Sequence, residues 1–322
     1  MTVKNLIFSE HASDAPTGRK PDIGVHLHAF YPDLIPTFVE RLSFIPTPFT
    51  LYVSVPEGVN ADEAALKEEL SRIPQAEDIC IRRTPNRGRD IAPMLCTFAD
   101  ELMSHDIILH LHTKKSPQNV IQTGWLTFIL DYLLASPTNV NTILNCLQQD
   151  GGMVSPPNFL YRATPDGWGV PENIVLAQEI VDRSRLNINL ERDYPTIDFP
   201  QGSMFWARKE FLLPLFDLKL TYEDFPEEPI GLDGTVAHAL ERLFFLWGNG
   251  TKYNVYRVFH NNSDVTLQSR FFTMTQLLSR ERTYFIKKNQ KHLLLLRITL
   301  TLCALLTAII VYLLFFSNNS VI

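Results

Sequence analysis

The chain has 322 residues, of which 45% are hydrophobic and only 14 are glycine. A chain of this length and composition buries a sizeable core as one or two domains, which excludes an intrinsically disordered protein. Its 29 basic and 35 acidic side chains give a net charge of -6. Six basic residues and one acidic residue fall between positions 280 and 297, leaving 23 basic against 34 acidic side chains, a balance of -11, elsewhere. Such an acidic body excludes nucleic acid as a favoured partner.

The first half of the chain alternates apolar strands with amphipathic helices. In chain order we expect a strand at 24–30, a helix at 34–44, a strand at 49–55, a helix at 61–73, a strand at 78–84, a helix at 91–103 and a strand at 106–113. This order predicts an α/β fold with a mostly parallel sheet flanked by helices. Ligands of such sheets bind at the carboxyl ends of the strands.

The second half is less regular. We expect helices at 125–134 and 140–149, a short strand at 151–157, and a loop-rich stretch at 158–200 that holds one helix near 174–185. A strand at 203–207, helices at 210–216 and 234–247, and a strand at 253–259 complete the domain. The four cysteines, Cys80, Cys96, Cys146 and Cys303, have no paired spacing, so we expect them to be reduced.

The C-terminal part predicts a membrane anchor. Residues 298–316 carry no charge, and 293–296 extend this apolar run beyond Arg297, which is long enough to span about 30 Å of hydrocarbon. The basic residues at 280–297 precede it, so the positive-inside rule puts the domain in the cytoplasm and the basic segment against anionic lipids. The alternative is a helix lying on the membrane surface. The expected division is a tail at 1–20, the main domain at 21–262, a basic juxtamembrane linker at 263–292, a transmembrane helix at 293–316 and a short tail at 317–322.

Three polar clusters interrupt the apolar pattern: RTPNRGRDIAP (83–93), FPQGSMFWAR (199–208) and GLDGTVAHALER (231–242). A core needs only apolar residues, whereas these stretches combine glycine with Asn, Arg, Asp, His and Glu, as in a site for a polar ligand. They are spread over about half of the chain. We therefore expect one folded domain that brings them together.

Five motifs, HxHxFYPDL (26–34), NxGRDIxP (86–93), HTKKS (112–116), FPxGSMFWxR (199–208) and DGTxAHALER (233–242), occur in this order. Together they resemble the rhamnan synthesis protein F family, bacterial glycosyltransferase-like proteins of cell-surface rhamnose polysaccharides. The resemblance covers about residues 20 to 262. It implies a GT-A-like fold, an L-rhamnosyl transfer from a dTDP-sugar to a lipid-linked glycan, and a place at the bacterial inner (cell) membrane.

The first cluster is a candidate donor site. It falls between an expected strand and an expected helix, where free backbone N–H groups and the helix dipole attract a diphosphate. Asn86, Arg89 and Asp90 are the candidate residues, because an arginine adds bidentate phosphate contacts. The alternative is that Asn86 shapes the turn while Asp90 caps the helix.

Histidines and lysines at two strand ends extend the candidate donor site: His26 and His28 on the first strand, and His110, His112, Lys114 and Lys115 on and after the fourth. A GT-A-like fold would carry an acid-x-acid metal site after the fourth strand, and this pair is missing. The basic residues would then hold the diphosphate, with no metal ligand predicted, although another acid could still bind Mg²⁺ or Mn²⁺. The alternatives are a histidine metal site and histidines that are hydrogen-bonded at the strand ends.

The other two clusters are candidates for the sugar, the acceptor and catalysis. Gln201, Gly202, Ser203 and Trp206 would contact the sugar or acceptor, with core packing as the alternative for the tryptophan. Asp233 is the expected general base, at the position that the resemblance implies, and Glu228 is the substitute. Capping of the following helix is the alternative role for Asp233.

His238 and Glu241 form a polar stripe with Arg242 that would orient the acceptor. The sequence as a whole thus favours a membrane-anchored inverting glycosyltransferase. A non-catalytic protein that binds nucleotide sugars or glycans and a metal-dependent hydrolase are the alternatives.

Overall fold

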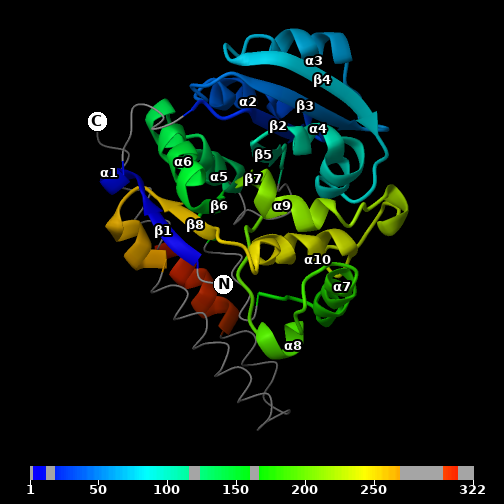
Figure 1. Cartoon of the computed structure of the whole chain (residues 1–322), viewed down its shortest axis with the longest axis vertical. Coiled ribbons are helices and arrows are strands. Elements are labelled where there is room, and N and C mark those ends of the chain that lie inside the picture. Colours follow the sequence, from blue (N-terminus) through cyan, green and yellow to red (C-terminus); the bar gives the residue numbers. More distant parts are fainter. Residues whose placement is uncertain (1–2, 12–18, 116–123, 160–166, 269–299, 311–322) are drawn as a thin grey trace.

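A computed structural model describes residues 3–11, 19–115, 124–159, 167–268 and 300–310. Within these ranges the strands form one eight-stranded sheet in the order β1-β8-β6-β7-β5-β2-β3-β4 (Figure 1). The strands are β1 (Val3–Ile7), β2 (Ile23–His28), β3 (Phe49–Pro56), β4 (Ala76–Thr84), β5 (Ile107–His112), β6 (Gly151–Ser155), β7 (Phe205–Arg208) and β8 (Asn254–Phe259).

The helices are α1 (Phe8–His11), α2 (Ile35–Leu42), α3 (Glu63–Leu70), α4 (Ala99–Ser104), α5 (Trp125–Leu133), α6 (Pro137–Gln149), α7 (Pro171–Asp182), α8 (Leu190–Asp193), α9 (Lys209–Phe216) and α10 (Val236–Leu243). They cover the two faces of the sheet. One hydrophobic cluster packs α2, α3, α5 and α6 against one face. A second cluster packs α4, α7, α9 and α10 against the other. The expected mostly parallel α/β sheet flanked by helices is confirmed.

One strand runs against the others. β7 pairs antiparallel with β5 and with β6, whereas every other pairing in this sheet is parallel. The parallel strands all end at one edge, so the reversed β7 begins at that edge. Residues just before β7 therefore lie at the same end of the strands as those that follow β2, β4 and β5, and β5 is the direct neighbour of β7.

The central strands are buried because both faces of the sheet are covered, as is usual for parallel sheets. Every residue of β2 and of β5 is buried. By contrast, β4 lies at an edge and exposes charged side chains such as Arg82 and Arg83.

Three expected elements differ in the structure. Residues 3–7, expected in a tail, form β1 and add to the sheet beside β8. The helix expected at 91–103 is divided into a π-type turn at Pro93–Thr97 and α4, since Phe98 leaves helical geometry at φ -118° and ψ 18°. The helix expected at 234–247 begins at Val236, because Gly234 has a φ of +80°, and it narrows to a 3₁₀ turn from Phe244.

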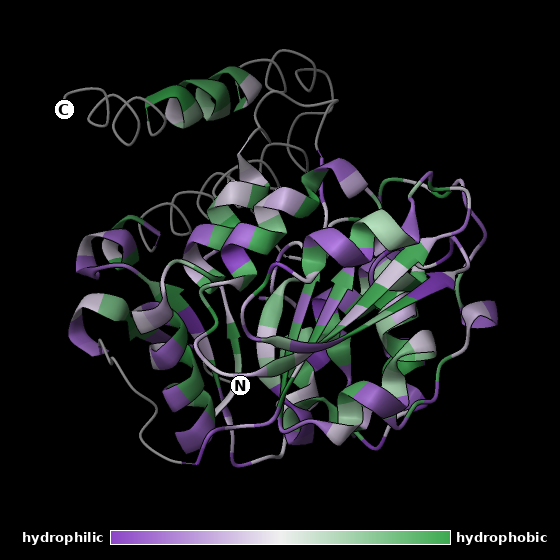
Figure 2. Ribbon diagram, turned by 90° about the horizontal axis from the view of Figure 1, so that it is seen from above, coloured by the Kyte–Doolittle hydropathy of each residue, from purple (hydrophilic) through white to green (hydrophobic). Residues whose placement is uncertain are grey.

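The expected membrane anchor lies mostly outside the described residues, as do most of the linker at 263–292 and all of the tail at 317–322. Of positions 293–316, the structure describes 300–310, which are helical and appear as a largely green helix near the C label in Figure 2. Apolar side chains of this helix, such as Leu302 and Leu306, are exposed. None of the helices within the described ranges has the length and apolar character needed to cross a membrane.

Candidate functional site

The polar motifs gather at the edge where the parallel strands end. The NRGRD loop follows β4, the HTKK segment follows β5, and the PQGS turn precedes the reversed strand β7. The segment before α10 joins them, since Arg89 Nη2 donates to the Gly231 carbonyl at 3.1 Å. The fold thus brings together the clusters that the sequence indicated, although they are far apart in the chain.

Four histidines lie side by side on one face of the sheet. In the register of the strands His26 is opposite His110, and His28 is opposite His112. Alternate residues of a strand face the same side, so all four rings share one face, as expected from the two HxH motifs. The rings of His26 and His110 stack with centroids 5.0 Å apart.

A continuous chain of hydrogen bonds runs through this row. His28 Nδ1 lies 2.9 Å from the Ser54 hydroxyl, which lies 3.0 Å from His26 Nε2. His26 Nδ1 is 2.9 Å from His110 Nδ1, and His110 Nε2 is 3.2 Å from Asp90 Oδ2. The chain links β2, β3 and β5 to the NRGRD loop.

Only one arrangement of protons satisfies this chain when Asp90 is ionised and each ring is neutral. His110 must donate its Nε2–H to Asp90, so its Nδ1 accepts from His26. Ser54 then donates to His26 Nε2 and accepts from His28 Nδ1. The buried chain therefore fixes the tautomer of each ring and holds the Asp90 carboxylate in place.

Burial keeps the imidazoles of His26, His28 and His112 neutral. Desolvation lowers the pKa of His28 to about 3, and it also lowers the pKa values of His26 and His112. Burial alone would raise the pKa of Asp90. His112 and the hydrogen bond from His110 outweigh burial, so the pKa of this carboxyl lies well below its ordinary range.

His26 and His110, expected to bind the donor, are wholly buried. Each uses both ring nitrogens within the chain of hydrogen bonds. Their position favours support of the Asp90 carboxylate over direct contact with a ligand.

His112 connects the strand ends to the last cluster. Its Nε2–H donates to the Gly202 carbonyl at 2.8 Å, and the Gly202 N–H donates to Glu241 Oε1 at 2.7 Å. Gly202 has a φ of +87°, and an added Cβ would lie 3.2 Å from the side chains of Ile129 and Trp125. The positive φ and the close side chains both favour glycine at this turn. Burial raises the pKa of Glu241.

The two lysines after β5 take different positions. The Lys114 ammonium lies 3.9 Å from the centre of the Trp125 ring, and its charge acts on both His112 and Glu241. Lys115 pairs with Asp33 beside the Tyr31 ring. Of these two candidate donor residues, Lys114 is the one nearer to the clustered side chains.

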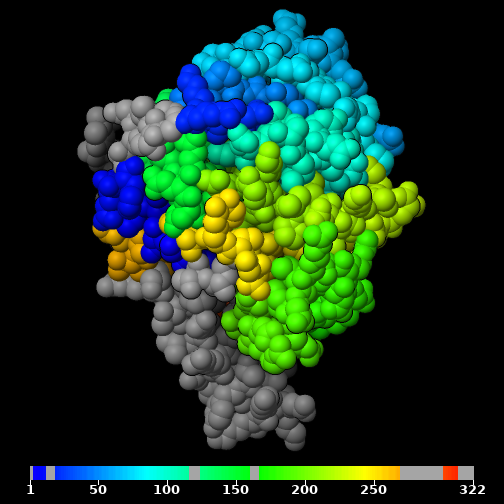
Figure 3. Space-filling view, viewed as in Figure 1, coloured from blue at the N-terminus to red at the C-terminus, as the bar shows by residue number. Residues whose placement is uncertain are grey.

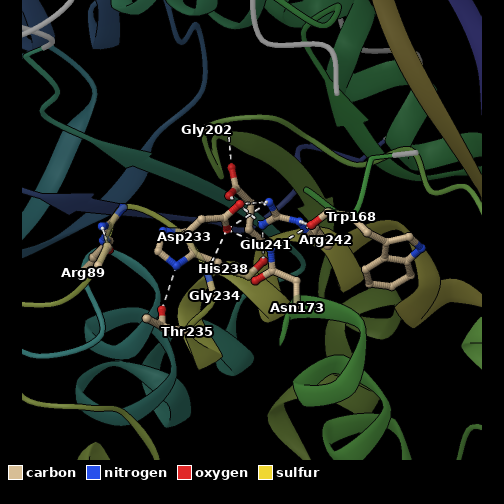
Figure 4. Close-up of polar contacts among 11 residues, drawn as sticks. Arg89, Trp168, Asn173, Gly202, Asp233, Gly234, Thr235, His238, Glu241 and Arg242 are labelled. Carbon is tan, nitrogen blue, oxygen red and sulfur yellow. Dashed lines mark hydrogen bonds and ion pairs between the residues drawn. The ribbon is translucent and has the colours of Figure 1, made fainter. Parts of the chain in front are cut away.

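Asp233, the expected base, is held in an ion pair. Arg242 Nη2 lies 3.1 and 3.0 Å from its two carboxylate oxygens, and Asn173 Nδ2 and the Gly234 N–H also donate to Oδ1 (Figure 4). The Asp233 side chain is 28% exposed and that of Arg242 is 7% exposed. The same guanidinium donates to the Trp168 and His238 carbonyls. This network favours a positioning role for Asp233.

The expected alternative, that Asp233 caps the helix, is wrong, because Thr235 occupies the N-cap of α10. Glu228, the substitute base, accepts a hydrogen bond from the Ile230 N–H in its own turn at 2.9 Å. The N-terminal turn of α10 is therefore not what holds the carboxylate of Asp233 or of Glu228 in place.

The loop after β4 is tied to the segment before α10. Arg87 Nε donates to the Phe225 carbonyl at 2.6 Å, and its backbone forms a bridge with Glu227. Figure 3 shows the surface of the 220–232 segment projecting beside that of β4 and its loop. Asn86 and Arg89 are exposed in this loop, and Arg89 has a φ of +55°. Two candidate phosphate-binding residues are thus accessible to solvent.

His238 has one ring nitrogen engaged and one without a partner. Its Nδ1 lies 2.8 Å from the Thr235 hydroxyl, whereas Nε2 is buried and makes no hydrogen bond within the described part of the protein. The residue is only 7% exposed. Burial and the positive charge of Arg89 lower its pKa to about 4, so the ring is neutral at physiological pH.

Trp206 is a correction to the expected sugar-binding wall. It is fully buried in the core, and its Nε1–H donates to the Leu133 carbonyl at 3.1 Å, so neither ring face can meet a sugar. Ser203, with a φ of +57°, donates its N–H to the Pro200 carbonyl and is also buried. Gln201 is half-buried at the same turn.

The histidines are not arranged around a cation. Over the described ranges, no group of three or more His, Cys, Asp or Glu side chains has the geometry of a metal site. Instead, His26 and His110 hydrogen-bond to each other, and the four rings also bond to Ser54, Asp90 or Gly202. This arrangement matches the expected alternative of histidines that are hydrogen-bonded at strand ends.

Several contributing residues were not singled out from the sequence. Ser54 lies in an apolar strand, and only its register opposite His28 reveals it. Asn173 lies in the loop-rich stretch, where no pattern indicates that it reaches Asp233. The ThrxxHis spacing of Thr235 and His238 was the one available signal, since residues i and i+3 meet on a helix.

The fold and site define an α/β protein whose polar loops converge at the carboxyl edge of a mostly parallel sheet. The chain matches the family model described as rhamnan synthesis protein F over residues 3–290, and it belongs to this family.

Two curated relatives are similar, each named uncharacterized protein WxcX, from Xanthomonas campestris pv. campestris strains ATCC 33913 and B100. Each is 30% identical over 231 residues, which is 69% of this chain and 31% of the relative. The chain thus spans about a third of their length. Among solved structures, S. aureus TarS 1–349 in complex with UDP has a TM-score of 0.36 and 11% identity, covering 79% of this chain and 65% of that one. A likeness this loose says nothing about function.

Proposed function

We propose that this chain is a glycosyltransferase with a GT-A-like domain, and that it transfers L-rhamnose from dTDP-rhamnose to a lipid-linked glycan. The observation that carries the proposal is the meeting of four polar motifs at the carboxyl edge of the sheet, in a member of the rhamnan synthesis protein F family. This edge is where parallel α/β sheets bind nucleotides.

The donor's diphosphate fits the side of the site that carries the NRGRD loop. Arg89 is exposed there and donates to a backbone carbonyl, Gly231 O, which a phosphate oxygen can replace with a charge-assisted bond. Asn86 lies in the same loop, and Lys114 approaches from the end of β5. These positive groups would stabilise the diphosphate as it leaves. No step of this scheme requires a metal ion.

The acceptor fits the side formed by the PQGS turn and α10. Glu241 and His112 hold the backbone of Gly202 from both sides, which fixes the turn. The sugar would lie between this turn and the loop with Arg89. Inverting transfer needs a group on this side that takes the proton of the attacking hydroxyl while the diphosphate departs on the other.

We also propose that residues 293–316 anchor the protein in the bacterial inner membrane, with the domain in the cytoplasm and the basic residues at 280–297 against anionic lipids. The apolar helix at 300–310 agrees with the middle of such an anchor. The test is extraction of the full chain from bacterial membranes. Retention after an alkaline carbonate wash supports the anchor, and release with the soluble fraction contradicts it.

The enzymatic proposal is tested with the purified full chain, dTDP-rhamnose and a lipid-linked glycan fraction as acceptor. The expected result is release of dTDP together with growth of the glycan by one deoxyhexose. If dTDP-rhamnose binds but is not used for transfer, and no other nucleotide sugar tested supports transfer, the role of a non-catalytic binding protein is favoured. Turnover with a UDP-sugar alone would contradict the rhamnose assignment and leave the transferase assignment intact.

A further inference from the structure

The last cluster contains three side chains that could take a proton, and their contacts distinguish them. Asp233 is engaged by Arg242, Asn173 and the Gly234 N–H. Glu241 accepts the Gly202 N–H and thereby fixes the turn before β7. His238 differs, because its Nε2 has no partner within the described residues.

Thr235 holds the ring of His238 in one orientation, and α10 lacks a side-chain hydrogen bond at its N-cap as a result. Thr235 occupies the N-cap of α10, where its hydroxyl would ordinarily accept a backbone N–H, yet it makes no capping bond. The hydroxyl instead meets Nδ1 of His238 at 2.8 Å. A cap is worth about 1 kcal/mol to a helix, so its diversion to a side chain is typical of a functional position. The tautomer that donates Nδ1–H to Thr235 leaves the lone pair on Nε2.

We propose that Nε2 of His238 is the atom that accepts the proton of the attacking hydroxyl, an inference that rests on the glycosyltransferase function proposed above. In this step the O–H bond of the acceptor breaks and its proton passes to Nε2. The acceptor oxygen forms a bond to the anomeric carbon. The bond from that carbon to the diphosphate oxygen breaks, and its electron pair leaves with the nucleoside diphosphate.

The charges around His238 couple this atom to the donor. Arg89 from the loop after β4 and Arg242 on α10 disfavour the protonated ring, whereas Asp90 and Asp233 favour it. Figure 4 shows the ring between Arg89 on one side and the Asp233–Arg242 pair on the other. Arg242 is already neutralised by Asp233, but Arg89 donates only to a carbonyl among its described contacts. A diphosphate bound to Arg89 would neutralise it and strengthen His238 as a base.

The test measures protonation of His238 directly. The full chain, labelled with ¹⁵N-histidine, is titrated between pH 7.5 and 3.5, a range that includes the ligand-free pKa of His238 near 4, with and without saturating dTDP, and His238→Gln identifies the signal. An opposite charge within about 4 to 6 Å shifts a pKa by about 1 to 3 units. We therefore expect the His238 midpoint to rise by about 1 unit or more with dTDP. In Arg89→Gln the midpoint should already be raised, and dTDP should move it less.

Two results separate the inference from the proposed function. If dTDP binds and the His238 midpoint does not rise, the inference is overturned while the donor site stands. If the chain binds neither dTDP nor any other nucleoside diphosphate, the glycosyltransferase proposal fails and this inference fails with it.

A kinetic arm uses a matched pair of buried histidines. Loss of a general base lowers kcat by about 10²- to 10⁴-fold, and we expect this from His238→Gln with dTDP affinity retained. The control variant, His105→Gln, removes a buried histidine that lies just before β5, at the end of the strands opposite the site. His105 contacts Tyr52 and Asp22, and its replacement should leave kcat unchanged. A kcat for His238→Gln within threefold of the parent would overturn the inference.

Discussion

The buried histidine row makes the stability of the protein depend on pH, and replacing His28 by asparagine measures its share. An asparagine amide lies near the position of Nδ1 and keeps the contact with the Ser54 hydroxyl. The substitution therefore removes the ionisable imidazole at position 28 and keeps this hydrogen bond. Burial lowers the pKa of His28 from 6.5 to about 3 in the folded state.

The sign of the effect follows from proton counting. Below pH 6.5 the unfolded chain binds a proton at His28, whereas the folded protein does not bind it until the pH approaches 3. The unfolded state therefore binds more protons in this window, and folding stability falls as the pH decreases. For this one group the loss between pH 7.5 and 5.0 is about 2 kcal/mol. The lowered pKa values of His26 and His112 add to it in the same direction.

The assay is urea denaturation of the parent and of His28→Asn at pH 7.5 and at pH 5.0. We expect the parent to lose at least about 2 kcal/mol of unfolding free energy over this interval, and the variant to lose about 2 kcal/mol less than the parent. Equal losses in the two proteins, or a parent whose stability does not change, would refute the claim that these rings are held neutral by burial.

Three further predictions concern the site. Gly202→Ala should lower the free energy of unfolding by about 2 to 3 kcal/mol in thermal unfolding, because the new Cβ meets neighbouring side chains in addition to the strain of a positive φ. Gly58 has a φ of +82° but open space around it, so Gly58→Ala should cost about 1 kcal/mol. Equal costs would contradict the claim that side chains crowd position 202. Asp233→Asn should destabilise the fold by about 1 to 3 kcal/mol in urea and retain far more transfer activity than His238→Gln; equal loss of transfer would restore Asp233 as the base. Trp206→Phe should destabilise by about 1 to 3 kcal/mol with unchanged dTDP affinity by calorimetry, and weakened binding with a stable fold would return it to the site.

The sheet was predictable because its strands have simple patterns. The runs at 24–30, 49–55 and 106–113 are apolar and separated by amphipathic helices, which determines a parallel βαβ arrangement. β1 was missed because Val3–Ile7 contains Lys4 and Asn5 and pairs only at an edge, where one face needs little apolar surface. The π-type turn at Pro93–Thr97 was missed because a local apolar period does not distinguish it from an α-helix.

The site was predictable as a set of loops and less so as a set of roles. Strand register carries the four histidines to one face, so the HxH motifs were informative. Roles depend on partners that are remote in sequence. Arg242 reaches back nine positions to Asp233, and Asn173 reaches it from α7 across 60 positions. A sequence pattern identifies a carboxylate near a helix start, but it does not reveal that a buried guanidinium already holds it.

The central claim is that a nucleotide-sugar donor binds at the carboxyl edge of this sheet, and a crystal structure of the full chain with dTDP bound tests it most directly. The account predicts diphosphate oxygens in hydrogen-bond contact with the Arg89 guanidinium, on the side of the site that His238 faces. A nucleotide bound at another surface, with Arg89 still donating to the Gly231 carbonyl, would contradict it.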